Sequence, residues 1–132
     1  MGKKIILGTI CVFILWSVLD FLIHGVILRS AYEATASLWR PMAQMKMGLM
    51  YAVVLIAASM FVLIYGRFVT PKNPASGVPF GLLYGIGVGV GMGYGTYSVM
   101  PIPYSMALAW FLGAVAEGAL GGLVLGFLFR ER

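Results

Sequence analysis

Two polar side chains, Asp20 and His24, lie four residues apart inside an apolar run that extends from residue 5 to residue 28. An ionisable group in hydrocarbon costs roughly 2 kcal/mol or more, so it needs a partner or a function. A spacing of four puts both side chains on one face of a helix. Ser17 continues that face toward the N-terminus, and a second acid, Glu117, lies in the middle of the last apolar run. These four residues can form one track for protons or cations if the first and last runs are neighbours.

The same four residues can also have a purely structural role. In that arrangement Asp20 holds His24 by a hydrogen bond, and Glu117 bonds a nearby serine, tyrosine or backbone group. We expect this structural arrangement first and keep a protonatable or cation-binding site as the alternative. No nucleophile motif accompanies His24, which is the only histidine, so we do not expect an enzyme.

The composition identifies an integral membrane protein. Of the 132 residues, 61% are hydrophobic and only 10% are charged, whereas soluble domains carry about 25% charged residues. A spanning helix needs about 20 apolar residues, and the chain has suitable runs for an all-α, polytopic fold. We therefore predict a single transmembrane domain over residues 1–132, with four transmembrane helices at 5–28, 44–66, 78–98 and 105–129.

The charged residues predict the orientation of this four-helix domain. Six of the nine Lys and Arg residues flank the side of the spans that carries both chain ends, and short cytoplasmic loops are rich in these residues. We therefore place both termini in the cytoplasm and the protein in the bacterial inner membrane. The basic residues that give the net charge of +5 occur in ones and twos, so nucleic acid is not an expected partner.

The segment after the first span carries a helix-start signal. Residues 30–33, Ser-Ala-Tyr-Glu, match a capping box. This match predicts a short interfacial helix over 31–39, which ends before Pro41 because a residue that precedes proline avoids helical geometry. The alternative is that the first span simply continues as a helix past the interface.

The third and fourth spans are predicted to form an antiparallel hairpin. Residues 100–104, Met-Pro-Ile-Pro-Tyr, leave only a tight link between them. Residues 68–77, which precede the third span, read as a turn-rich loop that cannot continue a helix.

Glycines at a spacing of four predict close packing of these two spans, of the glycine-zipper kind. Small residues at this spacing let helix backbones approach closely in lipid. Two ladders on different faces of the third span allow two close neighbours, and glycines in the fourth span bracket Glu117. The glycines concerned are Gly81, Gly85, Gly89 and Gly93 in one ladder, Gly87, Gly91 and Gly95 in the other, and Gly113, Gly118, Gly121, Gly122 and Gly126 in the fourth span.

Methionines near the predicted outer face suggest a soft-metal site. Thioethers with one imidazole suit Cu(I), and the candidate ligands are His24, Met42, Met45, Met47 and Met50. At helical angles, however, the first two methionines lie on one side and the last two on another, so no single cluster forms. Copper handling at the outer face is therefore a minor alternative, and we predict no cofactor other than bound lipid.

Three features together indicate a relationship to known proteins: residues 16–24 (Trp-Ser-Val-Leu-Asp-Phe-Leu-Ile-His), residues 38–41 (Leu-Trp-Arg-Pro) and a last span rich in Gly and Ala. With these features, most of the chain resembles small, uncharacterised four-helix membrane proteins of bacteria, a resemblance that implies no activity. Small multidrug transporters are similar in size, number of spans and the presence of an acid in the first span. Their acid is a glutamate in a different pattern, so that similarity concerns architecture only.

These observations favour a non-enzymatic membrane protein that works by helix packing. It would be an accessory or assembly subunit of a larger membrane complex, or a homo-oligomer, because glycines occupy several helix faces and almost no mass lies outside the membrane. Its partners would be lipids and either other membrane-protein subunits or further copies of the chain. The alternative is a small proton- or cation-coupled transporter or channel that uses Asp20, His24 and Glu117.

Overall fold

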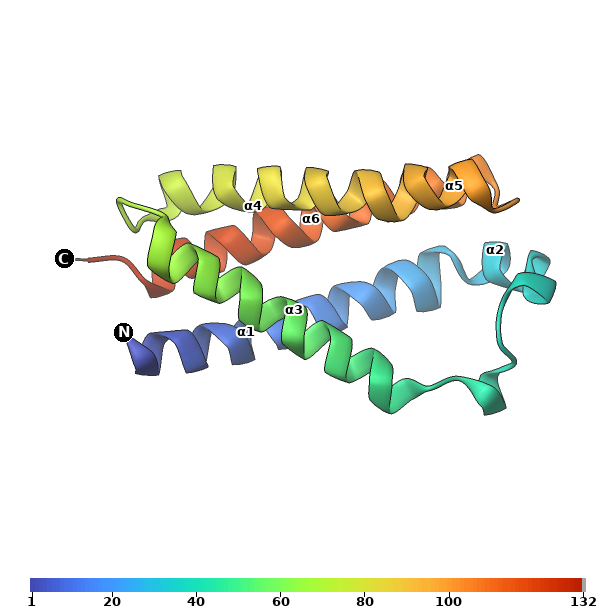
Figure 1. The fold of residues 1–132 in the computed structure, drawn as a ribbon, viewed down its shortest axis with the longest axis horizontal. Coiled ribbons are helices and arrows are strands. Elements are labelled where there is room, and N and C mark those ends of the chain that lie inside the picture. The colour runs from blue at the N-terminus through green and yellow to red at the C-terminus, as the bar shows by residue number, and fades with distance from the viewer. Residues whose placement is uncertain (132) are drawn as a thin grey trace.

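Four long helical segments dominate the computed structural model, which describes residues 1–131 (Figure 1). Each segment has the length and hydropathy to cross a membrane, since a span needs about 20 predominantly apolar residues. The segments are Gly2–Ile27, Met47–Phe68, Pro74–Val99 and Tyr104–Leu128. The predicted all-α, polytopic fold is confirmed.

Two of the four spans change helix type along their length. The first consists of α1 (Gly2–Asp20) and the π-helical η1 (Phe21–Ile27), and the third consists of α4 (Pro74–Gly89), the π-helical η4 (Val90–Gly95) and α5 (Thr96–Val99). The other spans are α3 (Met47–Phe68) and α6 (Tyr104–Leu128). Short helices between the first two spans are α2 (Arg29–Ala34), η2 (Ala36–Leu38) and η3 (Met42–Gln44). Single π-helical turns inside longer helices are rare and often mark functional sites.

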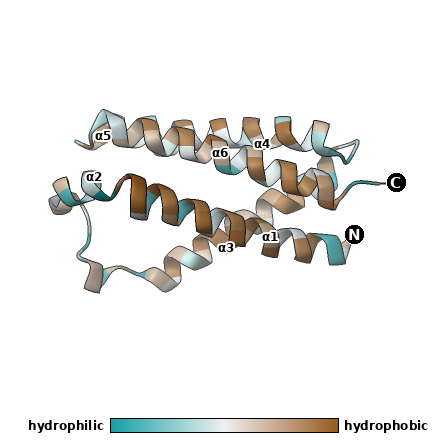
Figure 2. Ribbon diagram, turned by 180° about the vertical axis from the view of Figure 1, so that it is seen from behind, coloured by the Kyte–Doolittle hydropathy of each residue, from teal (hydrophilic) through white to brown (hydrophobic). Residues whose placement is uncertain are grey.

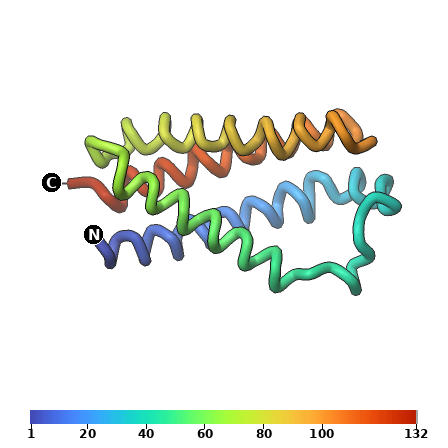
Figure 3. The backbone as a smooth tube through the Cα atoms, viewed as in Figure 1, coloured from blue at the N-terminus to red at the C-terminus, as the bar shows by residue number. Residues whose placement is uncertain are grey.

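The four spans form two layers. α4 and α6 make an antiparallel hairpin, and α1 packs against both α6 and α3 (Figure 1). Both termini lie at the same end of the bundle. α3 crosses α1, and its N-terminal half then leaves the bundle toward η3 (Figure 3). Hydrophobic residues cover most of the long helices, whereas hydrophilic ones gather at the chain ends and around α2 (Figure 2).

Glycines bring α4 and α6 into backbone contact. A Cβ atom on Gly81 would overlap the backbone oxygen of Gly118, and one on Gly77 would overlap that of Gly122. The other glycines of this contact are Gly85, Gly89 and Gly93 on the third span and Gly126 on α6. Close approach of this kind lets two helices pack tightly in lipid, and here both helices belong to one chain.

No helix among residues 1–131 packs against the second predicted ladder of the third span. A Cβ atom on Gly87 or Gly91 would meet nothing within 4 Å, and one on Gly95 would meet only the backbone oxygen of Val90 in its own span, at 3.8 Å. The glycine pattern of the third span allows two close helix neighbours, and the described chain supplies one of them, α6.

A different face of α6 receives the first span at the level of Glu117. A Cβ atom on Gly113 would lie 2.8 Å from Cδ1 of Ile23, and one on Gly121 would lie 3.2 Å from Nε1 of Trp16. Glu117 lies midway between these two glycines in the sequence. Because these two positions of α6 are glycines and carry no side chain, η1 and α1 come close to Glu117.

The start of α4 corrects one sequence prediction. Residues 68–77 do not all form a loop, because α4 begins at Pro74, and the third span is longer than the predicted 78–98. Oδ1 of Asn73 accepts a hydrogen bond from the Ser76 amide at 3.0 Å, and the Ser76 hydroxyl accepts one from the Asn73 amide at 3.3 Å. Proline suits the first helical position, where an N–H would have no intrahelical acceptor.

The connection after the first span also differs from the prediction. α2 begins at Arg29 after a single turn residue, Leu28, and η2 follows it, so no continuous helix covers 31–39. Ser30 makes no capping hydrogen bond, and Glu33 instead pairs with Arg29, with 3.2 Å between Nε and Oε1. The capping box fails because the helix starts two residues earlier than predicted, at Arg29, which places Ser30 inside it rather than at its N-cap.

Two packed apolar clusters lie at opposite ends of the bundle. The cluster nearer the termini is built on Val12, Trp16, Phe61, Val62, Tyr65, Leu125 and Phe129. The cluster at the far end is built on Leu28, Ile102, Met106 and Ala107. Asp20 and Glu117 fall between these clusters along α1 and α6, in a section where the apolar packing is interrupted.

Candidate functional site

A cavity of about 190 Å³ lies between the four spans, in the section that separates the two apolar clusters. α1 and η1 supply one wall with an acid and an imidazole, α6 supplies a second acid, and α3 and α4 contribute the remaining sides. The polar and aromatic side chains that line it are Asp20, His24, Glu117, Trp16, Tyr84 and Trp110. The structure thus brings Asp20, His24 and Glu117 to one place.

The two carboxyl groups of the cavity, those of Asp20 and Glu117, come from different spans, α1 and α6. The Asp20 side chain is 37% exposed. Oε1 of Glu117 is shielded from solvent and has no hydrogen-bond partner among residues 1–131. A shielded carboxyl oxygen without a donor is costly unless a proton or a ligand satisfies it. The pair is therefore suited to hold one proton or one cation.

Trp16 joins all four spans beside the acid pair. Its Nε1 donates a hydrogen bond to the backbone oxygen of Glu117 at 2.9 Å. Its ring packs on Phe61 of α3 and stacks on Tyr84 of α4, with centroid distances of 5.1 and 6.4 Å. The indole is 7% exposed, so its contacts limit how α6 can move against α1 at the height of Glu117.

His24 belongs to an aromatic network at the other end of the cavity. Its Nδ1 lies 2.6 Å from the hydroxyl oxygen of Tyr32, and that oxygen accepts a hydrogen bond from Nε1 of Trp110 at 2.9 Å. Trp39 packs edge-on against both Tyr32 and Trp110. Because an indole N–H can only donate, the Tyr32 hydroxyl hydrogen is free to point at Nδ1, which leaves the imidazole proton on Nε2.

The hydrogen bond expected between Asp20 and His24 is not formed. Nε2 of His24 lies 3.9 Å from Oδ1 of Asp20, which is longer than a hydrogen bond, and the short contact of the imidazole is to Tyr32 instead. Ser17 does not line the cavity, and its buried hydroxyl has no partner among residues 1–131. The polar track therefore consists of Asp20, His24 and Glu117 without Ser17.

Sequence reasoning missed the aromatic part of the site. Trp110 precedes Glu117 by seven residues in α6, and this spacing, which returns to the same helix face, could have linked that ring to the acid. Tyr32 lies in α2, beyond the turn residue Leu28, so no helical spacing links it to His24. Burial raises the pKa of the Tyr32 hydroxyl, and the nearby Asp20 carboxylate raises it further, while the Trp110 hydrogen bond acts in the opposite direction. The Tyr32 hydroxyl therefore stays protonated at pH values above its ordinary pKa of 10.0, and it can donate its hydrogen to His24.

The candidate copper ligands do not gather around His24. The four candidate methionines line no part of the cavity and are 40–83% exposed; they are Met42, Met45, Met47 and Met50. They lie in η3, in the link that follows it and at the start of α3, the part of the chain that leaves the bundle (Figure 3). Within residues 1–131, no group of three or more His, Cys, Asp or Glu side chains is placed to hold a metal ion.

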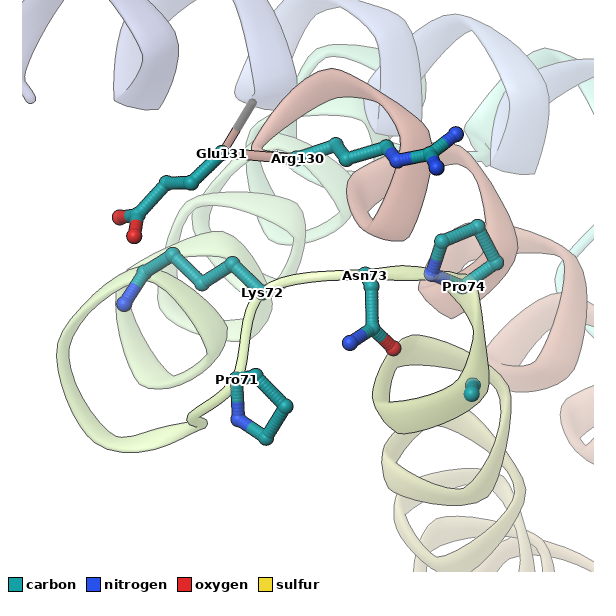
Figure 4. Close-up of a pocket in the computed structure, with 7 residues that line it drawn as sticks. Pro71, Lys72, Asn73, Pro74, Arg130 and Glu131 are labelled. Atoms are coloured by element: carbon teal, nitrogen blue, oxygen red, sulfur yellow. The ribbon is translucent and has the colours of Figure 1, made fainter.

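A larger hollow, of about 610 Å³, lies at the terminal end of the bundle beside the start of α4 (Figure 4). Lys72, Arg130 and Glu131 line it. The charged ends of Lys72 and Arg130 point in different directions in Figure 4, so they do not converge on one anion. The smaller intramembrane cavity is the better candidate site, because titratable groups from two spans meet there.

Asp20, His24 and Glu117 are the acidic and imidazole residues of the spans, and all three line the same cavity. Concave, largely apolar sites with a few convergent polar groups are typical of ligand binding. No known protein family, no curated protein and no solved structure matches the chain.

Proposed function

We propose that the protein is a small carrier or channel that binds a proton or a cation in the intramembrane cavity. The observation that carries the proposal is that Asp20, His24 and Glu117, from two different spans, line one cavity. Asp20 and Glu117 are two of the four acidic residues in the chain, and the other two lie outside the spans. Ionisable residues in a membrane interior are costly, and they typically mark ion paths and proton relays.

The cavity has a chain of proton-carrying groups on one side. Tyr32 contacts His24, and His24 lies next to Asp20, which lines the same cavity as Glu117. We infer that protons or cations reach the acid pair from the end of the bundle that carries α2, opposite the termini. With both termini in the cytoplasm of a bacterial inner membrane, as the Lys and Arg distribution favours, that entrance faces outward.

Flux measurements in proteoliposomes test the proposal. The purified protein is reconstituted with a pH-sensitive dye inside, and a pH step or a cation gradient is imposed. We expect the wild type to change the internal pH faster than protein-free liposomes, and Asp20→Asn and Glu117→Gln to reduce that rate to the protein-free value. Glu33→Gln is the matched control, since Glu33 is an exposed acid outside the spans that pairs with Arg29. No flux in the wild type, or equal flux in all variants, would rule the proposal out.

A role as an accessory subunit or homo-oligomer is the second candidate, and the unpartnered glycine ladder favours it. A Cβ atom added to Gly87 or Gly91 would have nothing within 4 Å, and a bare glycine face permits a close helix neighbour in lipid. In this case Gly87→Leu should dissociate a native assembly, which native mass spectrometry in mild detergent would detect. An unchanged mass would argue against this role.

A further inference from the structure

We propose that the cation bound in the cavity is a small organic ammonium ion with methyl or ethyl groups on its nitrogen. This inference rests on the proposed function, because it names the substrate class of the same site. It is carried by the placement of two carboxyls, those of Asp20 and Glu117, in one cavity with the rings of Trp16, Tyr84 and Trp110.

A bare metal ion fits this cavity poorly. Hard cations such as Ca²⁺ take about six to eight oxygen ligands, and Mg²⁺ demands a near-ideal octahedron. The oxygen-bearing side chains that line the cavity are those of Asp20, Glu117 and Tyr84. α3 contributes only the aliphatic side chains of Val53, Val54 and Ala57. A cation that gains by contact with apolar groups is the better match.

An alkylated ammonium ion has the properties that the walls require. Its charge is attracted to aromatic faces, which is the way proteins recognise quaternary ammonium groups, and its alkyl groups pack against aliphatic side chains. The cavity volume is about 190 Å³, and an apolar cavity of about 150 Å³ holds a benzene molecule. The space therefore suits an ion of roughly five to nine non-hydrogen atoms.

Binding of the ammonium ion replaces a proton. A cation and a proton compete for the carboxyl pair of Asp20 and Glu117, because two negative charges at one site repel each other and either ligand relieves the repulsion. The other titratable groups that face the pair are His24 from η1 and Tyr84 from α4. Where the pair carries a proton, entry of one ammonium ion displaces it, and the charge of the site stays constant.

Cation titrations of the detergent-solubilised, full-length protein test the inference. Trp16 and Trp110 line the cavity, so intrinsic tryptophan fluorescence reports on its occupancy. The probes are tetramethylammonium and tetraethylammonium chloride, with NaCl and KCl at equal ionic strength and tetrabutylammonium chloride as an ion too large for the cavity. We expect a saturable change with the first two salts only, together with proton release in weak buffer.

Matched variants connect the signal to the site. Glu117→Gln should weaken tetramethylammonium binding about tenfold or more, and Tyr84→Leu should weaken it roughly three- to thirtyfold. The controls Glu33→Gln and Tyr51→Leu, which change an acid and a tyrosine that do not line the cavity, should bind as the wild type does. Circular dichroism checks that each variant is folded. If Glu117→Gln does not fold, Asp20→Asn and the cation selectivity of the wild type decide the question.

The outcomes separate the two proposals. If protons or Na⁺ produce a Glu117-dependent response and the ammonium salts produce none, the proposed function stands and the ammonium assignment is overturned. If neither protons nor any of these cations produces a Glu117-dependent response, both proposals fail. Equal binding of the small ammonium ions and tetrabutylammonium would also overturn the assignment, because the cavity would then not select by size.

Discussion

Nε1 of Trp16 donates a hydrogen bond to the backbone oxygen of Glu117 at 2.9 Å, across 101 positions of sequence. The contact joins the first span to the last at the height of the acid pair. Asp20 lies four residues after Trp16, on the same helix face. The face of α1 that binds the backbone of Glu117 therefore also carries the carboxyl of Asp20. The Trp16 side chain thus positions the two acids relative to each other.

Trp16→Phe should lower the free energy of unfolding by about 1–3 kcal/mol, because it removes this hydrogen bond and leaves a small cavity. Unfolding in mixed micelles, followed by circular dichroism as SDS is added, measures the change. Trp39→Phe provides the comparison, because the Trp39 indole donates its hydrogen bond to Thr35 within the outer connection and not to another span, although its ring also packs on Trp110. Equal stability of Trp16→Phe and the wild type would show that the contact contributes nothing.

Tyr32→Phe should destabilise the protein in a pH-dependent manner. At pH 8 the variant loses the contacts of the hydroxyl with His24 and Trp110, which should cost about 1–3 kcal/mol. The pKa of Tyr32 is raised by burial above its ordinary value of 10.0, so the folded state holds the hydroxyl proton more tightly than the unfolded state does. The stability that this group contributes is therefore fully present below pH 10 and is lost as the pH rises through the higher folded-state pKa.

The difference in unfolding free energy between wild type and Tyr32→Phe should accordingly shrink between pH 10 and pH 11. Other titrating groups are common to both proteins, so their contributions cancel in this difference. A difference that stays constant or grows over this range would contradict the raised pKa of Tyr32.

The sequence predicted the four spans well because they follow from local composition. Runs of apolar residues define the helices, and an acid such as Glu117 inside a run is visible without any structure. The prediction of a capping box was wrong because the helix starts two residues earlier, which moves Ser30 from the N-cap into the helix. The Trp110–Tyr32 bond was missed because it depends on how α6 packs beside the outer connection, which local periodicity does not specify.

Asn73→Ala should lower the free energy of unfolding by about 1 kcal/mol, which is typical for the loss of an N-cap side chain. The Asn73 side chain accepts a hydrogen bond from the Ser76 amide at the start of α4. Asn73→Asp keeps the acceptor and should be close to the wild type. The same SDS titration measures all three proteins, and equal losses in both variants would mean that the cap is not the cause.

Gly81→Ala and Gly87→Ala form a matched pair that tests the packing of α4 on α6. Both positions lie in the same helix, but a Cβ atom at Gly81 would overlap the backbone oxygen of Gly118, whereas one at Gly87 would meet nothing within 4 Å. Gly81→Ala should therefore lower the free energy of unfolding by about 1–3 kcal/mol, as overpacking does. Gly87→Ala should leave it unchanged or raise it by up to about 1 kcal/mol, because alanine favours a helix. A Gly81→Ala variant as stable as the wild type would show that α4 and α6 do not approach this closely. A Gly87→Ala variant as destabilised as Gly81→Ala would show that the helix face with Gly87 packs against a neighbour outside this chain.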